Sequence, residues 1–528
     1  MNILGLHYGH DGAACIVKEG KIAAAISTER LTKQKKAPGV TDEVIDYVIA
    51  ASNLTFEEVD VICLADYFSE HAQGTLDLYI ENRPVHNTSQ MVFFNEVVYG
   101  IGKMRDRWLQ VIILPHHLCH CASAYFTSPF DSSWCFSLDS SGGAIQANSL
   151  IAYGEGNKLY ARDHPGLMIG VGYADFTELC GIGPALFKAG TMMGLAAYGE
   201  PCADVVTHID SYIQQSYFRN DSYIDYYPNL FFKWSKSKRK LTHSESASPE
   251  AFMLAASIQY LLERCVRDVL EFKIQKHETY NLCLSGGTLL NCNTNSYIAT
   301  HSSFKQFHHF PGCGDDGIAV GAALYVHHHI FNNPKTIYKF KEICYLGKPS
   351  PIQEPNYKEI AEYLAKGSIV AWFFGGSEYG PRALGNRSIL ADPRNFHNRE
   401  LINFVIKNRE WYRPFAPVVL EEYYKDWFEF DFPSPFMLYT AKVRQPKEIP
   451  AVTHIDGSAR FQTVNKETNL YYYNLIQAFY EITGVPVLLN TSLNGNSEPI
   501  LETVQDAYHF METSNVDFLV LNGETFRK

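Results

Sequence analysis

A strand–turn–strand unit that occurs twice constrains the fold of this chain more than any single motif. The first copy places three short apolar segments around the turn Gly9-His10-Asp11-Gly12, within residues 2–26. The second copy places three similar segments around the polar, Gly-containing turn 139–143, within residues 134–161. Short apolar runs that alternate with such turns predict hairpins of β-strands. Because an internal repeat decides the fold class before any local motif does, we expect an α/β domain built from two similar halves.

Two such halves, each with a Gly-rich turn that can approach a phosphate, resemble the ATPase fold of actin, sugar kinases and Hsp70 (ASKHA). In that fold the nucleotide lies in the cleft between the halves. The alternative is that two β-meanders are alike by chance. A third turn of this kind, Ser285-Gly286-Gly287, follows an apolar run and enters a predicted helix, whose N-terminus favours an anion.

A possible three-ligand metal set lies directly before the second turn. His116 and His120 are four residues apart, so a helix presents both imidazoles on one face. Asp139 ends the apolar run 134–138 and supplies a carboxylate from a strand end. Two imidazoles and a carboxylate suit zinc or iron with one coordination position open, and Asp315 in the sequence GDDG is the candidate fourth ligand. The alternatives are an ordinary helix with a polar histidine face and an Asp315 that only caps a helix.

An anion site is indicated in the C-terminal third of the chain. From Arg382 to Arg413 the sequence has seven Lys or Arg residues and three acidic ones, in a protein of formal net charge −12. Arg binds phosphate or carboxylate through paired donors, and Lys supplies a point charge. The alternative is a solvated helix face, which the apolar and Gly-rich surroundings of Arg382 and Arg387 disfavour. The buried strand 485–489 runs into Asn490 and Ser492, small polar residues that also suit a phosphoryl or amide ligand.

Composition excludes several classes of function. A chain of 528 residues with 46% hydrophobic and 19% charged residues is expected to form two or three globular domains. Its acidic balance argues against nucleic-acid and membrane-surface binding, and no apolar run is long enough for a transmembrane helix. The N-terminus lacks the features of a signal peptide. Twelve cysteines without a CxxC pair indicate reduced, mostly buried thiols in a cytoplasmic protein.

The motifs taken together resemble the NodU/CmcH-type O-carbamoyltransferase family over essentially the whole chain. The resemblance rests on an ordered set, of which GPRALGNRSIL is the most specific: HHLCHCASAY, LDSSGG, MMGLAAYG, CLSGGTLLNC, GDDGIAVGAAL, GPRALGNRSIL, KNREWYRPFAP and VLLNTSLN. It implies an actin-like domain over 1–335, similar to the metalloprotein of tRNA threonylcarbamoylation. A linker over 336–355 and an α/β, YrdC-like domain over 356–528 would follow.

The resemblance also implies a reaction. The YrdC-like domain would make carbamoyl adenylate from carbamoyl phosphate and ATP, and the first domain would transfer the carbamoyl group to a hydroxyl of a small-molecule acceptor. Relatives act on antibiotics, sugars and lipo-oligosaccharides, so the acceptor itself is not identified. ATP, with Mg, and carbamoyl phosphate would be substrates, and iron or zinc the bound metal. No nucleic-acid or membrane partner is expected, and a homodimer is left open.

Site residues follow from the same motifs. His10 matches the residue that acts at the acceptor hydroxyl. The metal ligands would be His116, His120, Asp139 and Asp315. The carbamoyl phosphate-binding residues would be Arg382, Lys407, Arg413, Arg460, Asn490 and Ser492. The nucleotide-binding residues would be Gly142, Gly143, Gly286, Gly287 and Asn291.

Two positions depart from the family pattern. Gly376 stands where many relatives have Arg, which leaves one anion contact in doubt. Thr191 and Met192 precede the MGLA sequence where many relatives have Lys, and the nearest lysine is Lys188. The rival functions are an actin-like kinase or ATPase with a regulatory C-terminal domain, and a tRNA-modification component or non-catalytic nucleotide-binding partner.

Overall fold

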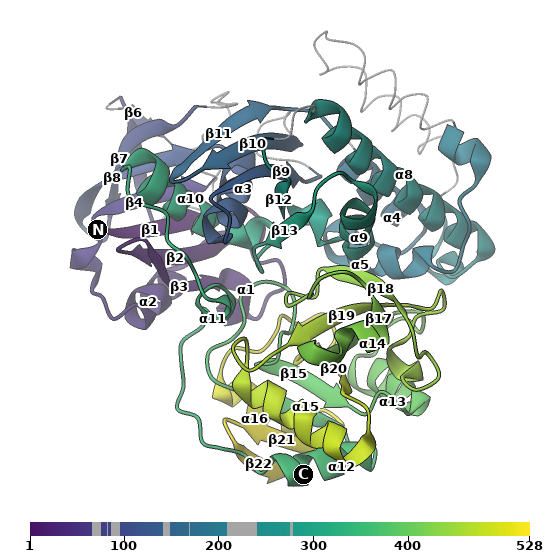
Figure 1. Cartoon of the computed structure of the whole chain (residues 1–528). Coiled ribbons are helices and arrows are strands. Elements are labelled where there is room, and N and C mark those ends of the chain that lie inside the picture. The colour runs from purple at the N-terminus through teal and green to yellow at the C-terminus, as the bar shows by residue number, and fades with distance from the viewer. Residues whose placement is uncertain are drawn as a thin grey trace. The chain divides into compact units, whose positions relative to one another are not determined.

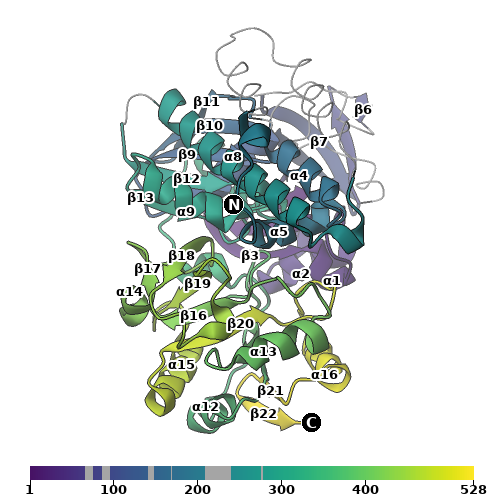
Figure 2. The ribbon, with the colours of Figure 1, turned by 90° about the vertical axis from the view of Figure 1, so that its right-hand side faces the viewer.

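The computed structural model describes residues 1–65, 75–81, 83–85, 96–140, 148–167, 169–207, 240–274 and 278–528 (Figures 1 and 2). These residues form two compact units. The first unit comprises residues 1–6, 10–60 and 338–528, and the second comprises residues 7–9 and 61–337. The N-terminal strands are therefore grouped with the C-terminal part of the chain.

The first copy of the repeat is part of an eight-stranded sheet with the order β3-β2-β1-β4-β8-β7-β5-β6. Strands β2 and β3 pair antiparallel, and β4 and β8 pair parallel. Beyond β8 the sheet is extended by antiparallel strands that the sequence pattern did not predict. The strands are β1 (Asn2–His7), β2 (Ala13–Lys18), β3 (Lys21–Ser27), β4 (Val61–Ala65), β5 (Asp77–Ile80), β6 (Arg83–Val85), β7 (Val98–Met104) and β8 (Arg107–Leu114).

The second copy forms a five-stranded sheet with the order β11-β10-β9-β12-β13. Its first three strands form an antiparallel meander, and β12 and β13 continue the sheet parallel to β9. The order of the first five strands in the larger sheet is the same, which confirms the predicted duplicated actin-like fold. The strands are β9 (Ser132–Leu138), β10 (Ser149–Glu155), β11 (Lys158–Asp163), β12 (Asn281–Ser285) and β13 (Gln306–His309).

Helices of the second unit pack on this sheet and on one another. Helix α3 (His116–Thr127) packs on β9 and β12 and against α10 (Ile318–Tyr325). Helix α8 (Pro249–Lys273) follows Ser248, whose side chain caps the helix by accepting a hydrogen bond from the N–H of Ala251. Its apolar face packs against α4 (Ile169–Leu179), α5 (Ala185–Ala196) and α9 (Cys292–His301) (Figures 1 and 2).

The C-terminal part of the first unit is a nine-stranded mixed sheet with the order β17-β18-β19-β16-β20-β15-β14-β21-β22. Helices α12 (Tyr357–Ala365) and α15 (Leu470–Thr483) pack against each other beside it, and α13 (Phe396–Leu401) and α16 (Val504–Thr513) complete the α/β arrangement. The strands are β14 (Val370–Phe373), β15 (Arg387–Ala391), β16 (Ala416–Leu420), β17 (Phe428–Glu429), β18 (Tyr439–Val443), β19 (Ser458–Val464), β20 (Val487–Ser492), β21 (Phe518–Leu521) and β22 (Glu524–Arg527). Short helices α1 (Thr28–Thr32), α2 (Asp42–Ala51), α11 (Phe340–Cys344) and α14 (Tyr424–Trp427) belong to the same unit.

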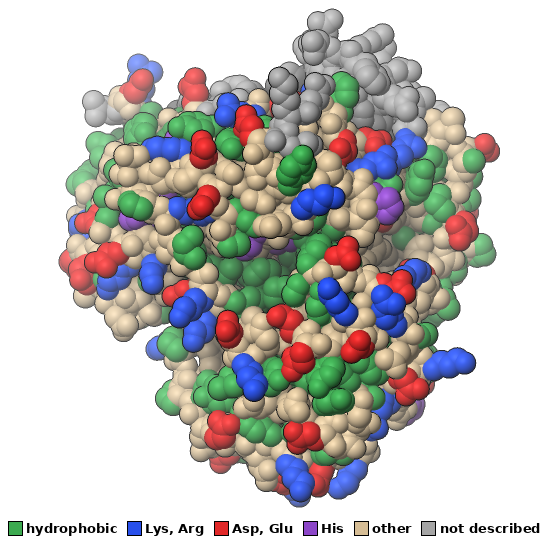
Figure 3. All heavy atoms as spheres, in the orientation of Figure 1, with side chains coloured by type: hydrophobic (Ala, Val, Ile, Leu, Met, Phe, Trp, Pro, Cys, Tyr) green, Lys and Arg blue, Asp and Glu red, His purple; other side chains and the backbone are tan. Residues whose placement is uncertain are grey.

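The distribution of charged side chains and the burial of the cysteines agree with what the composition predicts. On the face drawn in Figure 3, acidic and basic side chains of the described residues are interspersed rather than gathered by sign. All twelve cysteines are free thiols, and all but Cys202 are buried, as predicted. Within the described ranges, no helix has both the length and the apolar character needed to cross a membrane.

Candidate functional site

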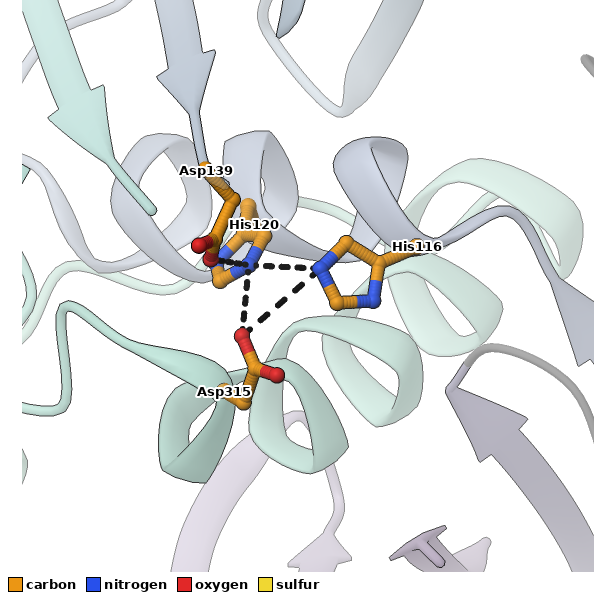
Figure 4. A group of neighbouring side chains, drawn as sticks. All are labelled: His116, His120, Asp139 and Asp315. Atoms are coloured by element: carbon orange, nitrogen blue, oxygen red, sulfur yellow. Dashed lines mark hydrogen bonds and ion pairs between the residues drawn. The ribbon is translucent and has the colours of Figure 1, made fainter. Parts of the chain in front are cut away.

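Four predicted metal ligands meet in the second unit. His116 and His120 lie one turn apart at the start of α3, which begins directly after Pro115. Asp139 follows the last residue of β9, and Asp315 opens a 3₁₀ turn that leads into α10. All four side chains are buried. Figure 4 shows that they point toward one another from three separate elements.

The ligand atoms of these four side chains all lie within 4.8 Å of one another, close enough to share one ion. His120 Nε2 lies 3.1 Å from His116 Nε2, 3.3 Å from Asp315 Oδ1 and 3.6 Å from Asp139 Oδ2. His116 Nε2 lies 3.6 Å from Asp315 Oδ1. Metal–ligand bonds of about 2.0–2.2 Å place tetrahedral ligands about 3.3–3.6 Å apart. The residues therefore fit a divalent ion, and two imidazoles with two carboxylates suit either zinc or iron.

Asp139 also binds the backbone of a Gly turn. Its Oδ1 accepts a hydrogen bond from the N–H of Ser140 at 2.6 Å, and its Oδ2 accepts one from the N–H of Gly287 at 2.9 Å. These bonds fix the direction in which the carboxylate faces the imidazoles. His117 is turned away from the group, because its Nδ1 lies 3.0 Å from Ser137 Oγ.

The turn at Gly286-Gly287 permits close approach of backbone to backbone. Gly286 has φ +103°, and a Cβ there would lie 2.2 Å from the carbonyl oxygen of Leu138, so only glycine fits. Asn291 caps α9 by accepting from the N–H of Thr294, and its amide donates to Gln259 Oε1 at 2.8 Å. Gly286 and Gly287 therefore lie beside Leu138 and Asp139, and Asn291 follows on the same segment. The predicted Gly142 and Gly143 lie outside the described residues.

His10 belongs to the first unit and is exposed at the first Gly turn. Its Nδ1 lies 3.3 Å from Asp11 Oδ2, and Lys36 Nζ donates to the same oxygen at 2.5 Å. The tautomer with the proton on Nδ1 donates to Asp11 and makes Nε2 the proton acceptor. The turn thus presents an imidazole oriented by a carboxylate.

Lys407 binds the polar end of β20 in the first unit. Its Nζ donates to the carbonyl oxygen of Ser492 at 2.5 Å, and to the side-chain and carbonyl oxygens of Asn494 at 2.5 and 2.9 Å. Lys407 is buried, and burial lowers its pKa well below the usual value. The positive charge of Arg409 lowers this pKa further.

Four arginines lie in the same region. Burial lowers the pKa of Arg409 well below its usual value, and the positive charges of Arg413 and Arg460 lower it further. Burial also lowers the pKa of Arg413, and the positive charge of Arg382 lowers it further. The carboxylate of Glu410, 3.7 Å from the Arg413 guanidinium, partly offsets these effects. A buried lysine among several half-buried arginines favours the binding of an anion.

Asn490 joins this cluster to the loop that carries Arg382. Its amide donates to the carbonyl oxygen of Ala383 and to Gln462 Oε1, both at 3.0 Å. Its Oδ1 is buried and makes no hydrogen bond within the described part of the chain. The structure therefore brings together all six predicted anion-binding residues: Arg382, Lys407, Arg413, Arg460, Asn490 and Ser492.

Sequence reasoning missed two residues of this region, Arg409 and Glu378, and did not assign a role to Arg387. Arg409 was counted in the charge excess but not chosen as a site residue. Glu378 was not noticed, although its Oε1 accepts hydrogen bonds from the N–H groups of Leu384 and Arg387 at 2.6 and 3.2 Å. Arg387 donates to backbone carbonyl oxygens, including that of Phe374 at 2.9 Å, so its guanidinium stabilises the backbone around it.

The structure explains one departure from the family pattern. A Cβ at Gly376 would lie 2.4 Å from the carbonyl oxygen of Gly347, which leaves no room for a side chain. The carbonyl oxygen of Gly376 accepts a hydrogen bond from Asn386 Nδ2 at 2.7 Å. Residue 376 is thus a packing position in this chain. Thr191, the other departure, is buried in α5.

Comparison with known sequences agrees with these motifs. The chain matches the family described as Carbamoyltransferase N-terminus over residues 2–324, and the family described as Carbamoyltransferase C-terminus over residues 361–528. A 3'-hydroxymethylcephem-O-carbamoyltransferase of Amycolatopsis lactamdurans is 31% identical over 100% of this chain and 99% of its own length. Nodulation protein NolNO of Sinorhizobium fredii is 32% identical over 98% of this chain and 79% of its own length. An uncharacterized protein of Synechocystis sp. is 33% identical over 100% of this chain and 97% of its own length.

Proposed function

The chain belongs to the carbamoyltransferase family, and from this premise we propose that it uses ATP and carbamoyl phosphate to carbamoylate a hydroxyl of a small molecule. The cationic cluster of the buried Lys407 and the half-buried Arg413 is the observation that carries the proposal. It lies in a chain of net charge −12, so the positive charge is local and suited to a phosphate substrate. One relative is named for O-carbamoylation of a hydroxymethyl cephem, which supports a hydroxyl as acceptor.

The first half of the proposed reaction takes place at the cationic cluster. Water hydrolyses carbamoyl phosphate to inorganic phosphate and carbamate, and a carbamate oxygen then attacks the α-phosphorus of ATP while pyrophosphate leaves. Arg382, Arg413 and Arg460 offset the phosphate charge and orient the reactants. The product, carbamoyl adenylate, has AMP as a good leaving group, which carbamate itself lacks.

The second half transfers the carbamoyl group. His10 accepts the proton of the acceptor hydroxyl as that oxygen attacks the carbamoyl carbon, and AMP leaves. Asp11 orients His10 through its Nδ1, at 3.3 Å. The turn Gly286-Gly287 supports the nucleotide through its backbone.

A divalent ion, zinc or iron, belongs to this proposal. His116, His120, Asp139 and Asp315 would hold it, and their spacing and burial support that assignment. A bound ion would supply Lewis-acid polarisation of an oxygen of the carbamoyl adenylate. The reduced thiols support a cytoplasmic location for the protein.

Pyrophosphate release from ATP tests the proposed function. The purified protein with ATP and Mg²⁺ should release pyrophosphate only when carbamoyl phosphate is added, and should form AMP when an acceptor is present. An actin-like kinase would instead produce ADP and no pyrophosphate, and that result would overturn the proposal. Labelled carbamoyl phosphate, incubated with ATP and extract of the producing cells, should then label the acceptor.

A further inference from the structure

A short segment of the first unit contacts both the His10 turn and the loop that carries Arg382. We call residues 28–36, which comprise α1 and the four residues after it, the strap. At the His10 turn, the N–H of Thr28 donates to the carbonyl oxygen of Gly12 at 2.6 Å. Lys36 Nζ donates to Asp11 Oδ2 at 2.5 Å. The strap is therefore held directly beside the proposed base.

Arg30 makes the contact between the strap and the loop that carries Arg382. Its Nη2 donates to the carbonyl oxygen of Gly380 at 2.8 Å and to that of Glu378 at 3.2 Å. Only 4% of Arg30 is exposed, so these bonds lie away from water, where a charged donor bonds strongly. A buried guanidinium bound to two carbonyl oxygens fixes the path of the backbone between them.

The loop so held is residues 378–384, with Arg382 near its end. Beyond Arg382 the loop is held a second time, because Glu378 Oε1 accepts from the N–H of Leu384 at 2.6 Å. Asn490 Nδ2 holds the carbonyl oxygen of Ala383 at 3.0 Å. The backbone on both sides of Arg382 is thus fixed, before it by Arg30 and after it by Glu378 and Asn490.

We propose that Arg30 is a positioning residue for carbamoyl phosphate, which acts by holding the loop of Arg382 in place from the strap. The inference rests on the proposed function, since it takes the anion at Arg382 to be carbamoyl phosphate. Arg30 itself touches no substrate in this arrangement. Because the strap also holds Asp11, the geometry of the anion loop and that of the His10 turn depend on one nine-residue segment.

The test compares Arg30→Met and Arg30→Lys with a matched control, Lys33→Met. Lys33 lies in the same strap and pairs with Asp506 Oδ1 at 2.5 Å, so it also joins the strap to the C-terminal part of the unit, but not to the loop. We expect Arg30→Met to raise the half-saturating carbamoyl phosphate concentration for pyrophosphate release about 10- to 100-fold. The reason is that a displaced Arg382 would lose one charge-assisted hydrogen bond to the phosphate, and the loss of such a bond has an effect of that size. The half-saturating ATP concentration should stay unchanged.

Arg30→Lys should recover part of the loss, and Lys33→Met should resemble the wild type. Equal effects of Arg30→Met and Lys33→Met, or equal changes for ATP and carbamoyl phosphate, would show that Arg30 only joins parts of the fold and would overturn the inference. Binding of inorganic phosphate, measured calorimetrically on the same full-length variants, decides the matter without activity. If the wild type bound phosphate but released no pyrophosphate, the proposed function would fail, whereas the inference would stand or fall on weaker phosphate binding by Arg30→Met.

Discussion

Replacing Lys407 with Met removes a buried cation and keeps most of the volume of its side chain. In the wild type, four oxygen atoms of Ser492 and Asn494 accept from its Nζ at 2.5, 2.5, 2.9 and 3.4 Å. Met cannot donate to them. The substitution therefore tests whether this lysine serves mainly the fold or mainly the binding of an anion.

The two roles predict effects of different size. Each hydrogen bond from a charged donor stabilises a fold by about 1.5–3 kcal/mol, but burying an ammonium group costs several kcal/mol. Because these contributions oppose each other, we expect Lys407→Met to lower the free energy of unfolding by at most about 3 kcal/mol. Removing a buried cation from a phosphate costs about 2–5 kcal/mol of binding free energy, which is roughly a 30- to 5,000-fold loss of affinity.

Thermal unfolding with and without inorganic phosphate measures both effects on one sample. The wild type should melt at a higher temperature in phosphate, and Lys407→Met should lose this shift while its melting temperature without phosphate falls only modestly. Lys425→Met is the control, because Lys425 is exposed in the same unit. A variant that keeps the full phosphate-induced shift would refute the assignment of Lys407 to the anion site.

The remaining predictions concern other parts of the molecule. His10→Asn should lower the rate of carbamoyl transfer about 10²- to 10⁴-fold and leave carbamoyl phosphate-dependent pyrophosphate release unchanged. Equal loss of both activities would contradict the proposed role of His10. Asp315→Asn should lower the affinity for zinc or iron at least about tenfold, measured by metal analysis after dialysis, and an undiminished metal content would exclude Asp315 as a ligand. Gly376→Ala should destabilise the fold by about 1–3 kcal/mol, because its Cβ would meet the carbonyl oxygen of residue 347 at 2.4 Å. Gly190→Ala, which meets nothing within 4 Å, should be neutral or stabilising in denaturant titrations. Burial raises the pKa of Glu263 from 4.5 to about 7. Between these pH values the native state keeps a proton that the unfolded state loses. The free energy of unfolding should therefore fall by about 3 kcal/mol as pH rises from 4.5 to 7. Glu263→Gln should remove that slope from unfolding curves measured across this range.

Much of the fold could be predicted because its signals are local. Short apolar strands with Gly turns revealed the repeat, and the i, i+4 spacing placed His116 and His120 on one helix face. The sequence did not predict β5 and β6, which are short, or β7, which is partly exposed, because their side chains carry little hydrophobic pattern. The grouping of residues 10–60 with the C-terminal part of the chain depends on contacts distant in sequence, which periodicity does not reveal.

The candidate site shows the same limit at single residues. Arg382 and Arg387 looked alike in sequence, since both stand among Gly and apolar residues. In the structure Arg387 is bound by backbone carbonyl oxygens, and nothing in its neighbours along the chain distinguishes it. Glu378 was overlooked for a related reason, because its partners are backbone N–H groups, which every residue type except proline possesses.

The bond from the amide of residue 287 to Asp139 has a consequence for mutagenesis. The donor belongs to the main chain, so no exchange of side chains can delete it. An alanine at this position would keep the bond but place its methyl group 3.1 Å from both carboxylate oxygens of Asp139, and would push on that carboxylate instead. An alanine scan would thus report crowding where the native interaction is a hydrogen bond. Only an ester in place of this one amide, introduced by chemical synthesis or an expanded genetic code, would show how far the proposed ion site depends on its neighbouring turn.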